Sequence, residues 1–198
     1  MRPWQRDIET LAGALNGDPV EPGFSFATEL GGAAAVIRSE DSTEPMDRTD
    51  FTLSVEAPAT WSDAEESDWN FRGAKVGVGL IVSPDVGAFH SGYKTPGAYV
   101  AASRTLQTTA PESVLDSERS KFPRCTLSSR GTFKRGGYTG SYDLWEACKN
   151  TTTQFLTIAA AKDDGSHIIY MQFQAPDPAD LAVLDRMLVT LDFTPDGL

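Results

Sequence analysis

The stretch CTLSSRGTFKRGGYTGSYDLWEAC, residues 125–148, decides the fold of this chain. Two segments of alternating apolar and polar residues flank Gly136-Gly137. A two-residue hairpin turn of the favoured type needs a positive φ at both central positions, which glycine adopts without strain. The stretch therefore predicts an antiparallel β-hairpin with Gly136-Gly137 at its tip.

The two-residue turn fixes which residues of this hairpin face each other. Each large ring lies opposite a glycine, and one pair joins opposite charges. The same register brings Cys125 opposite Cys148 and predicts a disulfide, worth about 3 kcal/mol in the chain-entropy model. A hydrogen-bonded pair is an unfavourable site for such a disulfide, an objection that a β-bulge in either strand would remove. The predicted pairs are Phe133 with Gly140, Gly131 with Tyr142, and Arg130 with Asp143.

With two cysteines in the chain, two free thiols or half of a metal site are alternatives to the disulfide. A tetrahedral zinc site would also need His90 and His167, and no two of these four residues have the spacing of a ligand pair. Thiol catalysis would need a nearby base, and neither histidine is close to a cysteine in the sequence. We therefore expect a disulfide, no metal and no cofactor.

A second hairpin is predicted where segments 153–162 and 166–175 flank Asp164-Gly165, a favoured type I′ pair. Its register gives one apolar face and one mixed face, which we expect to be partly covered. Asp177 is a good N-cap, and the leucines after it predict a closing helix that lies on the apolar face. The apolar pairs are Leu156 with Phe173, Ile158 with Met171 and Ala160 with Ile169; the mixed pairs are Thr157 with Gln172, Ala159 with Tyr170 and Ala161 with Ile168; the leucines are Leu181, Leu184, Leu188 and Leu191.

Residues 4–15 have the apolar spacing of an amphipathic helix, which either packs on the domain or is a linker helix from a longer protein. We divide the chain into this helix with its linker, residues 1–23, and a single domain, residues 24–198. The domain is predicted to be α+β, a mainly antiparallel β-sheet with helices packed on both faces. The remaining predicted elements are strands at 24–27, 34–37, 51–55, 76–82 and 99–103, a loop at 39–50, and a helix at 111–122 with Val114, Leu115 and Phe122 inward.

The composition is that of a globular and strongly acidic protein. The formal net charge is -11, which disfavours nucleic acid and anionic membranes as partners. No apolar run approaches the roughly 20 residues of a membrane span. No signal peptide follows Met1, which indicates a cytoplasmic protein, or else a mature or excised domain whose targeting segment has been removed. Oligomeric state and ligand are not defined by the sequence.

Motifs for common chemistries are missing or incomplete. The pair Gly77-x-Gly79 lacks the third glycine of a dinucleotide-binding loop, and the chain has no Gly-x-Ser-x-Gly turn. His167 falls at a hairpin tip, where we expect a solvated turn residue rather than a general base. His90 lies in a loop and is the better functional candidate. The acidic cluster at 63–68 is expected to be solvated surface, although paired carboxylates can serve glycoside hydrolysis.

Aromatic residues are concentrated between residues 61 and 99. Core filling is the first interpretation, and a partner-binding face is the alternative because Trp and Tyr are strong contact anchors. The candidate partner-binding residues, with the loop histidine included, are Trp61, Trp69, Phe89, His90, Tyr93 and Tyr99.

Several short motifs occur in a recognisable order between residues 51 and 193. They are Ala57-Pro58-Ala59-Thr60-Trp61 after a strand, Ser83-Pro84-Asp85, Pro96-Gly97, Cys125, Tyr138-Thr139-Gly140, and Trp145-x-x-Cys148. In this order the chain resembles Mog1/PsbP-like domains, in particular actinobacterial envelope lipoproteins of the LpqN type and related extracytoplasmic domains. The resemblance implies an antiparallel sheet with helices on both faces, an extracytoplasmic (secreted or envelope-anchored) location, and no shared catalytic residues.

The expected function is a non-enzymatic binding or accessory module of the cell envelope, because the scaffold is well specified and no catalytic constellation is assembled. A small hydrolase that uses His90 with carboxylates of segment 63–68 is one alternative. The other is an extracytoplasmic sensor domain of a larger membrane receptor. The partner, a protein or a small molecule, is left open.

Overall fold

The computed structural model describes residues 33–38, 51–177 and 179–195. The predicted helix at 4–15, the strand at 24–27 and the loop at 39–50 lie outside these residues. The described part is mainly antiparallel β-sheet with a few helices, as expected. The strands predicted at 34–37, 51–55, 76–82 and 99–103 and the helix predicted from residue 111 are all confirmed.

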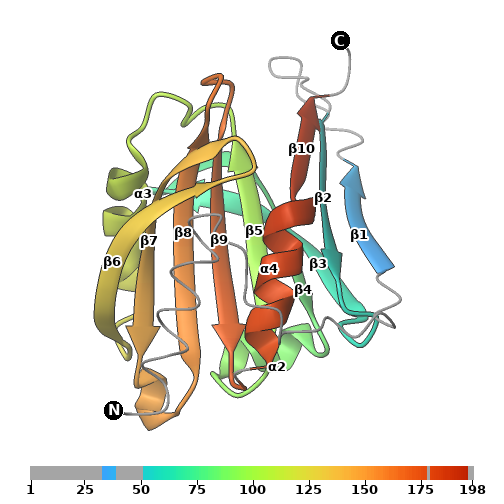
Figure 1. The fold of residues 1–198 in the computed structure, drawn as a ribbon, viewed down its shortest axis with the longest axis vertical. Helices are drawn as coiled ribbons and strands as arrows, with labels where there is room; N and C mark the ends of the chain where they lie inside the picture. Colours follow the sequence, from blue (N-terminus) through green and yellow to red (C-terminus); the bar gives the residue numbers. More distant parts are fainter. Residues whose placement is uncertain (1–32, 39–50, 178, 196–198) are drawn as a thin grey trace.

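The described strands form two antiparallel sheets (Figure 1). The larger sheet has the strand order β3-β4-β5-β9-β8-β7-β6, and the smaller one β1-β2-β10. The strands are β1 (Ala33–Arg38), β2 (Phe51–Ala57), β3 (Asp63–Phe71), β4 (Ala74–Ser83), β5 (Gly97–Ser103), β6 (Thr126–Arg135), β7 (Tyr138–Glu146), β8 (Gln154–Lys162), β9 (Ile168–Ala175) and β10 (Asp192–Pro195). The helices are α2 (Val86–Ser91), α3 (Pro111–Glu118) and α4 (Asp180–Thr190), with 3-10 turns η1 (Arg119–Lys121) and η2 (Cys148–Asn150).

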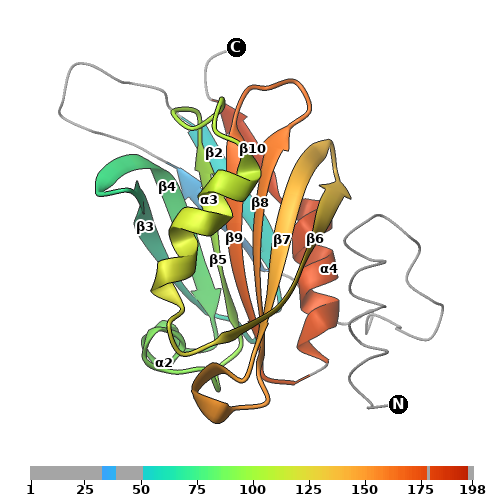
Figure 2. The same ribbon diagram turned by 90° about the vertical axis from the view of Figure 1, so that its left-hand side faces the viewer.

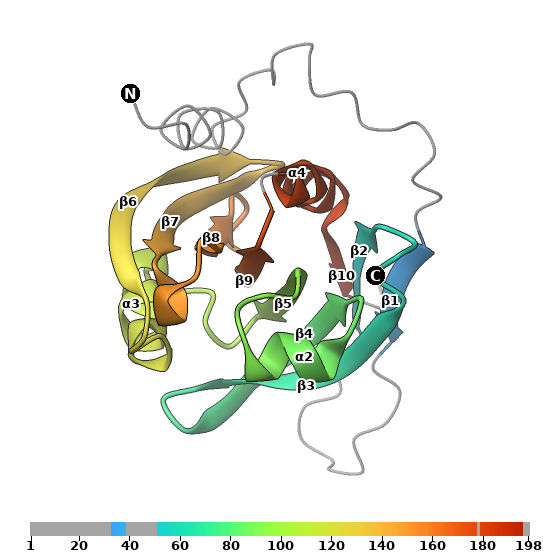
Figure 3. The same cartoon turned by 90° about the horizontal axis from the view of Figure 1, so that it is seen from below.

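The main core lies between the larger sheet and a second layer made of α4 and the smaller sheet. Figure 3 shows the larger sheet curving around this layer, so its inner face is defined here as the face toward α4. All three predicted apolar pairs of the second hairpin belong to this core. Leu184 and Leu188 are buried as predicted, and Met187 is buried between them.

The outer face of the larger sheet is covered by α3, which crosses it in Figure 2. Val114 and Leu115 of α3 are buried against Ala159, Ile168 and Tyr170. These three sheet residues come from the mixed face of the second hairpin, which we expected to be partly covered. The larger sheet therefore carries helices on both faces.

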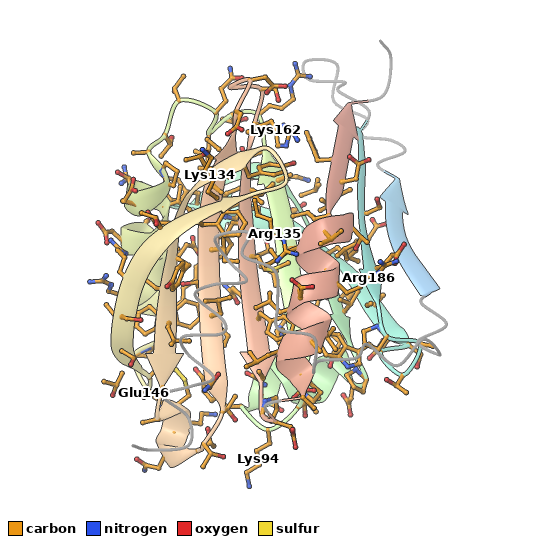
Figure 4. The ribbon with its side chains drawn as sticks, in the orientation of Figure 1. Lys94, Lys134, Arg135, Glu146, Lys162 and Arg186 are labelled. Atoms are coloured by element: carbon orange, nitrogen blue, oxygen red, sulfur yellow. A yellow bond between two sulfur atoms is a disulfide. The ribbon has the colours of Figure 1, made fainter. Side chains whose placement is uncertain are left out.

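Ion pairs hold α4 on both of its sides. Arg135 of β6 reaches Asp185 at 2.5 Å, and Arg186 donates through Nε to Glu56 of β2 at 2.7 Å. Figure 4 labels both arginines, which lie on either side of the helix. The helix thus links the edge of the larger sheet to the smaller sheet.

The first hairpin has the predicted register over most of its length. Gly136 and Gly137 both have positive φ, 61° and 77°, as the two-residue turn requires. A Cβ on Gly131 would lie 2.5 Å from the Tyr142 ring, so this ring does need an empty partner site. Gly140 has a different reason, because a Cβ there would meet the backbone oxygen of Ala159 on β8 at 2.1 Å.

The second hairpin also has the predicted register, but its turn is different. Gly165 donates to the Lys162 carbonyl at 2.8 Å, and Lys162 itself pairs with His167. Gly165 has a φ of 73°, whereas Asp164 is not left-handed. The predicted two-residue type I′ turn is therefore wrong, and the loop contains four residues, 163–166.

The closing helix begins at Asp180 with Ala179 in the N-cap position, two residues after the predicted N-cap Asp177. The Asp177 carboxylate accepts from the Ala179 amide at 2.9 Å, and the Asp180 carboxylate accepts from the Asp177 amide at 2.9 Å. This reciprocal pattern satisfies backbone donors that the first turn leaves unpaired.

Two strands were not predicted, β3 and β10. The residues of β3 from Asp63 to Asp68 are polar and mostly exposed, and only Trp69 and Phe71 are buried. β3 is an edge strand paired with β4, and charged side chains are common on such edges because they oppose edge-to-edge aggregation. The segment is solvated as expected, yet it is a strand.

The predicted pair of Arg130 and Asp143 is the centre of an ion network around one buried carboxylate, that of Asp143. Two hydrogen bonds join them, Nε to Oδ1 at 2.6 Å and Nη2 to Oδ2 at 2.9 Å. Asp116 of α3 lies 2.9 Å from the Arg130 guanidinium, and Arg119 lies 3.6 Å from Asp143. The carboxylate of Asp143 has no exposed area, and the bidentate contact raises the pKa of Arg130.

We expect the substitution Arg130→Met to lower the free energy of unfolding by about 3 kcal/mol or more, because it leaves the buried Asp143 charge poorly compensated. Urea denaturation measures this loss. The double variant Arg130→Met/Asp143→Leu should regain most of it. Lys75→Met is the matched control, since the Lys75–Asp68 pair is 61% and 52% exposed and should contribute less than about 1 kcal/mol. Equal effects at the two sites would contradict a dominant role for the buried pair.

Candidate binding surface at the disulfide end

The predicted disulfide between Cys125 and Cys148 is present, with an S–S distance of 2.01 Å. The two residues are not a ladder pair, however. The register shifts between Leu127 and Ser129, so the ladder ends at Thr126 and Glu146. The β-bulge that removes the objection to a disulfide at a hydrogen-bonded pair is therefore present. The disulfide forms just beyond the last paired residues of the ladder.

The turn after β7 has an unusual backbone. Ala147, Lys149 and Asn150 have positive φ values of 53°, 50° and 61°, although none is glycine. Residues in this region cost roughly 1 kcal/mol or more each and persist only when their surroundings impose them. Here the Lys149 amide donates to the Arg124 carbonyl at 2.9 Å, next to the disulfide. The disulfide and this hydrogen bond together fix the direction of Lys149.

An aromatic cluster lies directly beneath this turn. Phe122 is 4.7 Å from Phe155 and 5.5 Å from Trp145, measured between ring centroids. Tyr93 meets Phe155 edge-on at 6.1 Å and is only partly buried. The cluster gives the turn a rigid base and leaves one aromatic ring, that of Tyr93, at the surface.

One cation, that of Lys149, lies beside the partly exposed Tyr93 ring. The Lys149 ammonium lies 5.6 Å from the Tyr93 ring and donates to the Ser91 carbonyl at 3.1 Å. Lys94 follows Tyr93 in the chain, and Figure 4 shows its side chain pointing away from the lower end of the molecule. Lys94, Arg124 and Lys149 are exposed. We call Tyr93, Lys94, Arg124 and Lys149 the cationic end.

The charges of the cationic end are not neutralised within the described part of the chain. Neither Lys94 nor Arg124 has an ion pair there. Asp63 and Asp85 lie toward α2, where their carboxylates accept the backbone amides of Val86 at 2.9 Å and Ala88 at 2.8 Å. Glu146 also lies at this end of the molecule, to one side of Lys94 in Figure 4. The patch is thus cationic in a chain whose net charge is -11.

Four of the six candidate partner-binding residues lie away from this surface. Trp61 packs on Phe173 in the main core, and Trp69 stacks on Tyr170 at 5.6 Å with 1% exposure. Phe89 of α2 is buried in a cluster with Ile81 of β4, and Tyr99 is half-buried beside Tyr170. This burial supports core filling for Trp61, Trp69 and Phe89. Of the six candidates, His90 is exposed and Tyr93 is partly buried, and the two lie on either side of Ser91 and Gly92 in the sequence.

His90 is exposed in the last turn of α2, so its predicted place in a loop is wrong, and its one described contact is with the Phe89 ring, at 5.8 Å. The hydrolase alternative requires His90 beside a carboxylate of segment 63–68. Among the described residues no such contact is present, and Asp63 instead accepts the amide of Val86. The described geometry therefore gives His90 no acid–base partner.

His167 is buried, with 4% of its surface exposed, so the expectation of a solvated turn residue is wrong. Its Nε2 lies 2.8 Å from the Tyr138 hydroxyl, and its Nδ1 lies 2.8 Å from the Ser166 hydroxyl. Burial, assisted by the nearby Lys162 ammonium, lowers the pKa of His167 to about 4. An imidazole with this pKa is a weak general base at neutral pH. The sequence contained a signal, because His167 has the same strand parity as Ile169 and Met171, which point inward.

Arg124, Lys149 and Lys94 were not singled out from the sequence, where they are isolated charges far apart in the chain. The left-handed turn that gathers them has no sequence signature, because glycine does not occupy it. Only the disulfide prediction placed Arg124 near Lys149. No group of three potential ligand side chains in the described residues is arranged to hold a metal ion.

Comparison of the chain with protein-family models, curated proteins and solved structures finds no match. In the described residues, no helix has the length and apolar character needed to span a bilayer.

Reduction of the disulfide is expected to lower the free energy of unfolding by about 3 kcal/mol, because the bridge closes a loop between residues 23 apart. Urea denaturation with and without dithiothreitol measures the difference. The variant Cys125→Ala/Cys148→Ala should show the lower stability in both conditions. A wild-type protein that is insensitive to the reductant would contradict this.

Proposed function

We propose that this chain is an extracytoplasmic binding module of the cell envelope, and that its cationic end contacts a carboxylate-rich surface of a partner protein. The observation that carries the proposal is the position of Lys149. A disulfide and a left-handed turn hold it beside the half-exposed Tyr93, and its amide bonds to Arg124, which like Lys94 has no ion pair among the described residues.

The charge distribution supports an acidic partner. A protein of net charge -11 repels acidic molecules over most of its surface, so a local cationic patch determines which face an acidic partner meets. Tyr and Arg are also the side chains most often found at the energetic centre of protein interfaces. Tyr93 and Arg124 supply both types within one patch.

Rigidity supports a contact role for the same residues. Ordering a long side chain on binding costs about 0.5–1.5 kcal/mol. Lys149 is already restrained by its hydrogen bond to Ser91 and by the Tyr93 ring, so less of this cost remains. The left-handed backbone conformation of Ala147 and Lys149 is already present in the folded chain, so binding does not have to supply its energetic cost.

An extended anionic membrane fits this end of the molecule less well. Asp63 and Asp85 lie near the N-terminus of α2, and Asp177 and Asp180 lie at the start of α4, at the same end of the strands. A flat anionic surface would meet these carboxylates together with the cations. A compact acidic patch of a protein can contact the cations alone.

The cellular location is also part of the proposal. Disulfides persist in oxidising compartments, and Cys125–Cys148 is bridged. The resemblance to Mog1/PsbP-like domains implies the same location and a binding or accessory role. An antiparallel sheet with helices on both faces is compatible with that resemblance.

Binding of a fluorescently labelled deca-glutamate peptide at low salt tests the contact surface. We expect the wild type to bind it measurably, more weakly as salt rises, and Lys94→Glu/Arg124→Glu to lose at least about tenfold in affinity. The control Arg72→Glu/Lys134→Glu changes the net charge equally on other elements and should lose less than about threefold.

Two results would contradict the proposal. One is an equal loss in both double variants, which would mean that only net charge matters. The other is binding to vesicles with anionic lipid that exceeds binding to the peptide, which would favour a membrane as the partner.

A further inference from the structure

His167 lies where the end of the larger sheet meets β10. Its imidazole is 4.5 Å from the Phe193 ring of β10 and 5.5 Å from the Tyr138 ring of β7, between centroids. Phe193 and Tyr138 are both buried in the main core, so the histidine fills the junction between two layers. Its two nitrogens are hydrogen-bonded to the hydroxyls of Tyr138 and Ser166.

The charged groups around this junction come from four elements. Lys162 of β8 and Arg104 after β5 disfavour a positive charge on the imidazole, whereas Asp164 in the hairpin loop and Asp192 of β10 favour it. The Lys162 ammonium is the closest cation to the tyrosine partner, 4.3 Å from the Tyr138 ring. Burial raises the pKa of Tyr138 to about 12, so this phenol stays neutral and does not compensate an imidazolium.

We propose that His167 is an acid-sensitive latch for β10: proton uptake by its imidazole releases Asp192–Pro195 from the end of the larger sheet while the rest of the fold remains intact. The proposal concerns regulation and does not depend on the contact surface at the other end of the molecule.

β10 is the element that the latch releases because it is the shortest strand that contacts His167. It has four residues and pairs on one side, with β2, in the part of the chain that the structure describes. Tyr138 and Lys162, in contrast, belong to β7 and β8, which are paired on both sides. Opening at β10 exposes the imidazole to water and breaks one short ladder, whereas opening at β7 or β8 breaks the centre of a large sheet.

The sign of the pH effect follows from the two protonation equilibria. The pKa of His167 is about 4 in the closed state against an ordinary 6.5, so the released state binds the proton more tightly. Closure is therefore favoured fully above pH 6.5 and is lost as the pH falls toward 4. With these values, the opening equilibrium increases roughly 50-fold between pH 7 and pH 4.5.

Native-state amide exchange of the full chain, followed by NMR and corrected for intrinsic rates, tests the latch. Between pH 7 and pH 4.5 we expect protection of those β10 amides that bond to β2 to fall at least about tenfold more than protection of β8 and β9 amides. His167→Gln should remove this difference. His90→Gln is the matched control, because it changes the other histidine of the chain, and should retain it.

A second variant keeps the test decisive if His167→Gln does not fold. Lys162→Gln removes the cation that most disfavours the imidazolium, so it should raise the pKa of His167, measured by NMR of the imidazole, and reduce the pH effect on β10. A wild-type His167 that titrates near 6.5 would overturn the proposal. So would a loss of protection that is uniform across the fold, or one that survives both substitutions.

Discussion

The carboxylate of Asp143 has no exposed surface, and much of the architecture follows from the need to satisfy it. Arg130 of β6 supplies two hydrogen bonds, which ties the outermost strand of the larger sheet to β7 in one register. Asp116 then binds the same guanidinium from α3. A one-residue slip of β6 would move Arg130 to the other face of the sheet and leave the buried charge without its main partner.

Polar contacts with β7 also position α3, the helix that covers the outer face of the larger sheet. Glu112 accepts a hydrogen bond from Ser141 at 2.6 Å, so α3 is attached to β7 at a second point. That hydrogen bond is the main cause of the lowered pKa of Glu112. Val114 and Leu115 lie between the polar residues Glu112 and Asp116 of α3. Their apolar contacts cover the mixed face of the second hairpin.

The C-terminal half of the fold could be predicted because its determinants are local. Two glycines at a turn and an opposite-charge pair specify one hairpin, and alternating Ile, Leu, Met and Phe specify the next. The misjudged features depend on tertiary context. β3 carries too many exposed carboxylates to look like a strand, and the loop at 163–166 has four residues instead of two, with only Gly165 in the left-handed region. His167 was misplaced because its neighbours were read as a tip, whereas its pairing with Lys162 places it on the inner face.

The two proposed devices lie at opposite ends of the same strands and can act independently. The cationic end lies where β7 ends and β8 begins, and His167 pairs with the last residue of β8. A strand of this length separates the two by roughly 25 Å, at about 3.3 Å per residue, and charges at that distance are screened in physiological salt. β8 is paired on both sides and nearly all of it is buried, so it holds both ends in place without an alternative arrangement that would couple them. Release of β10 therefore changes the surface near β2 and leaves the turn at Lys149 as the disulfide fixes it.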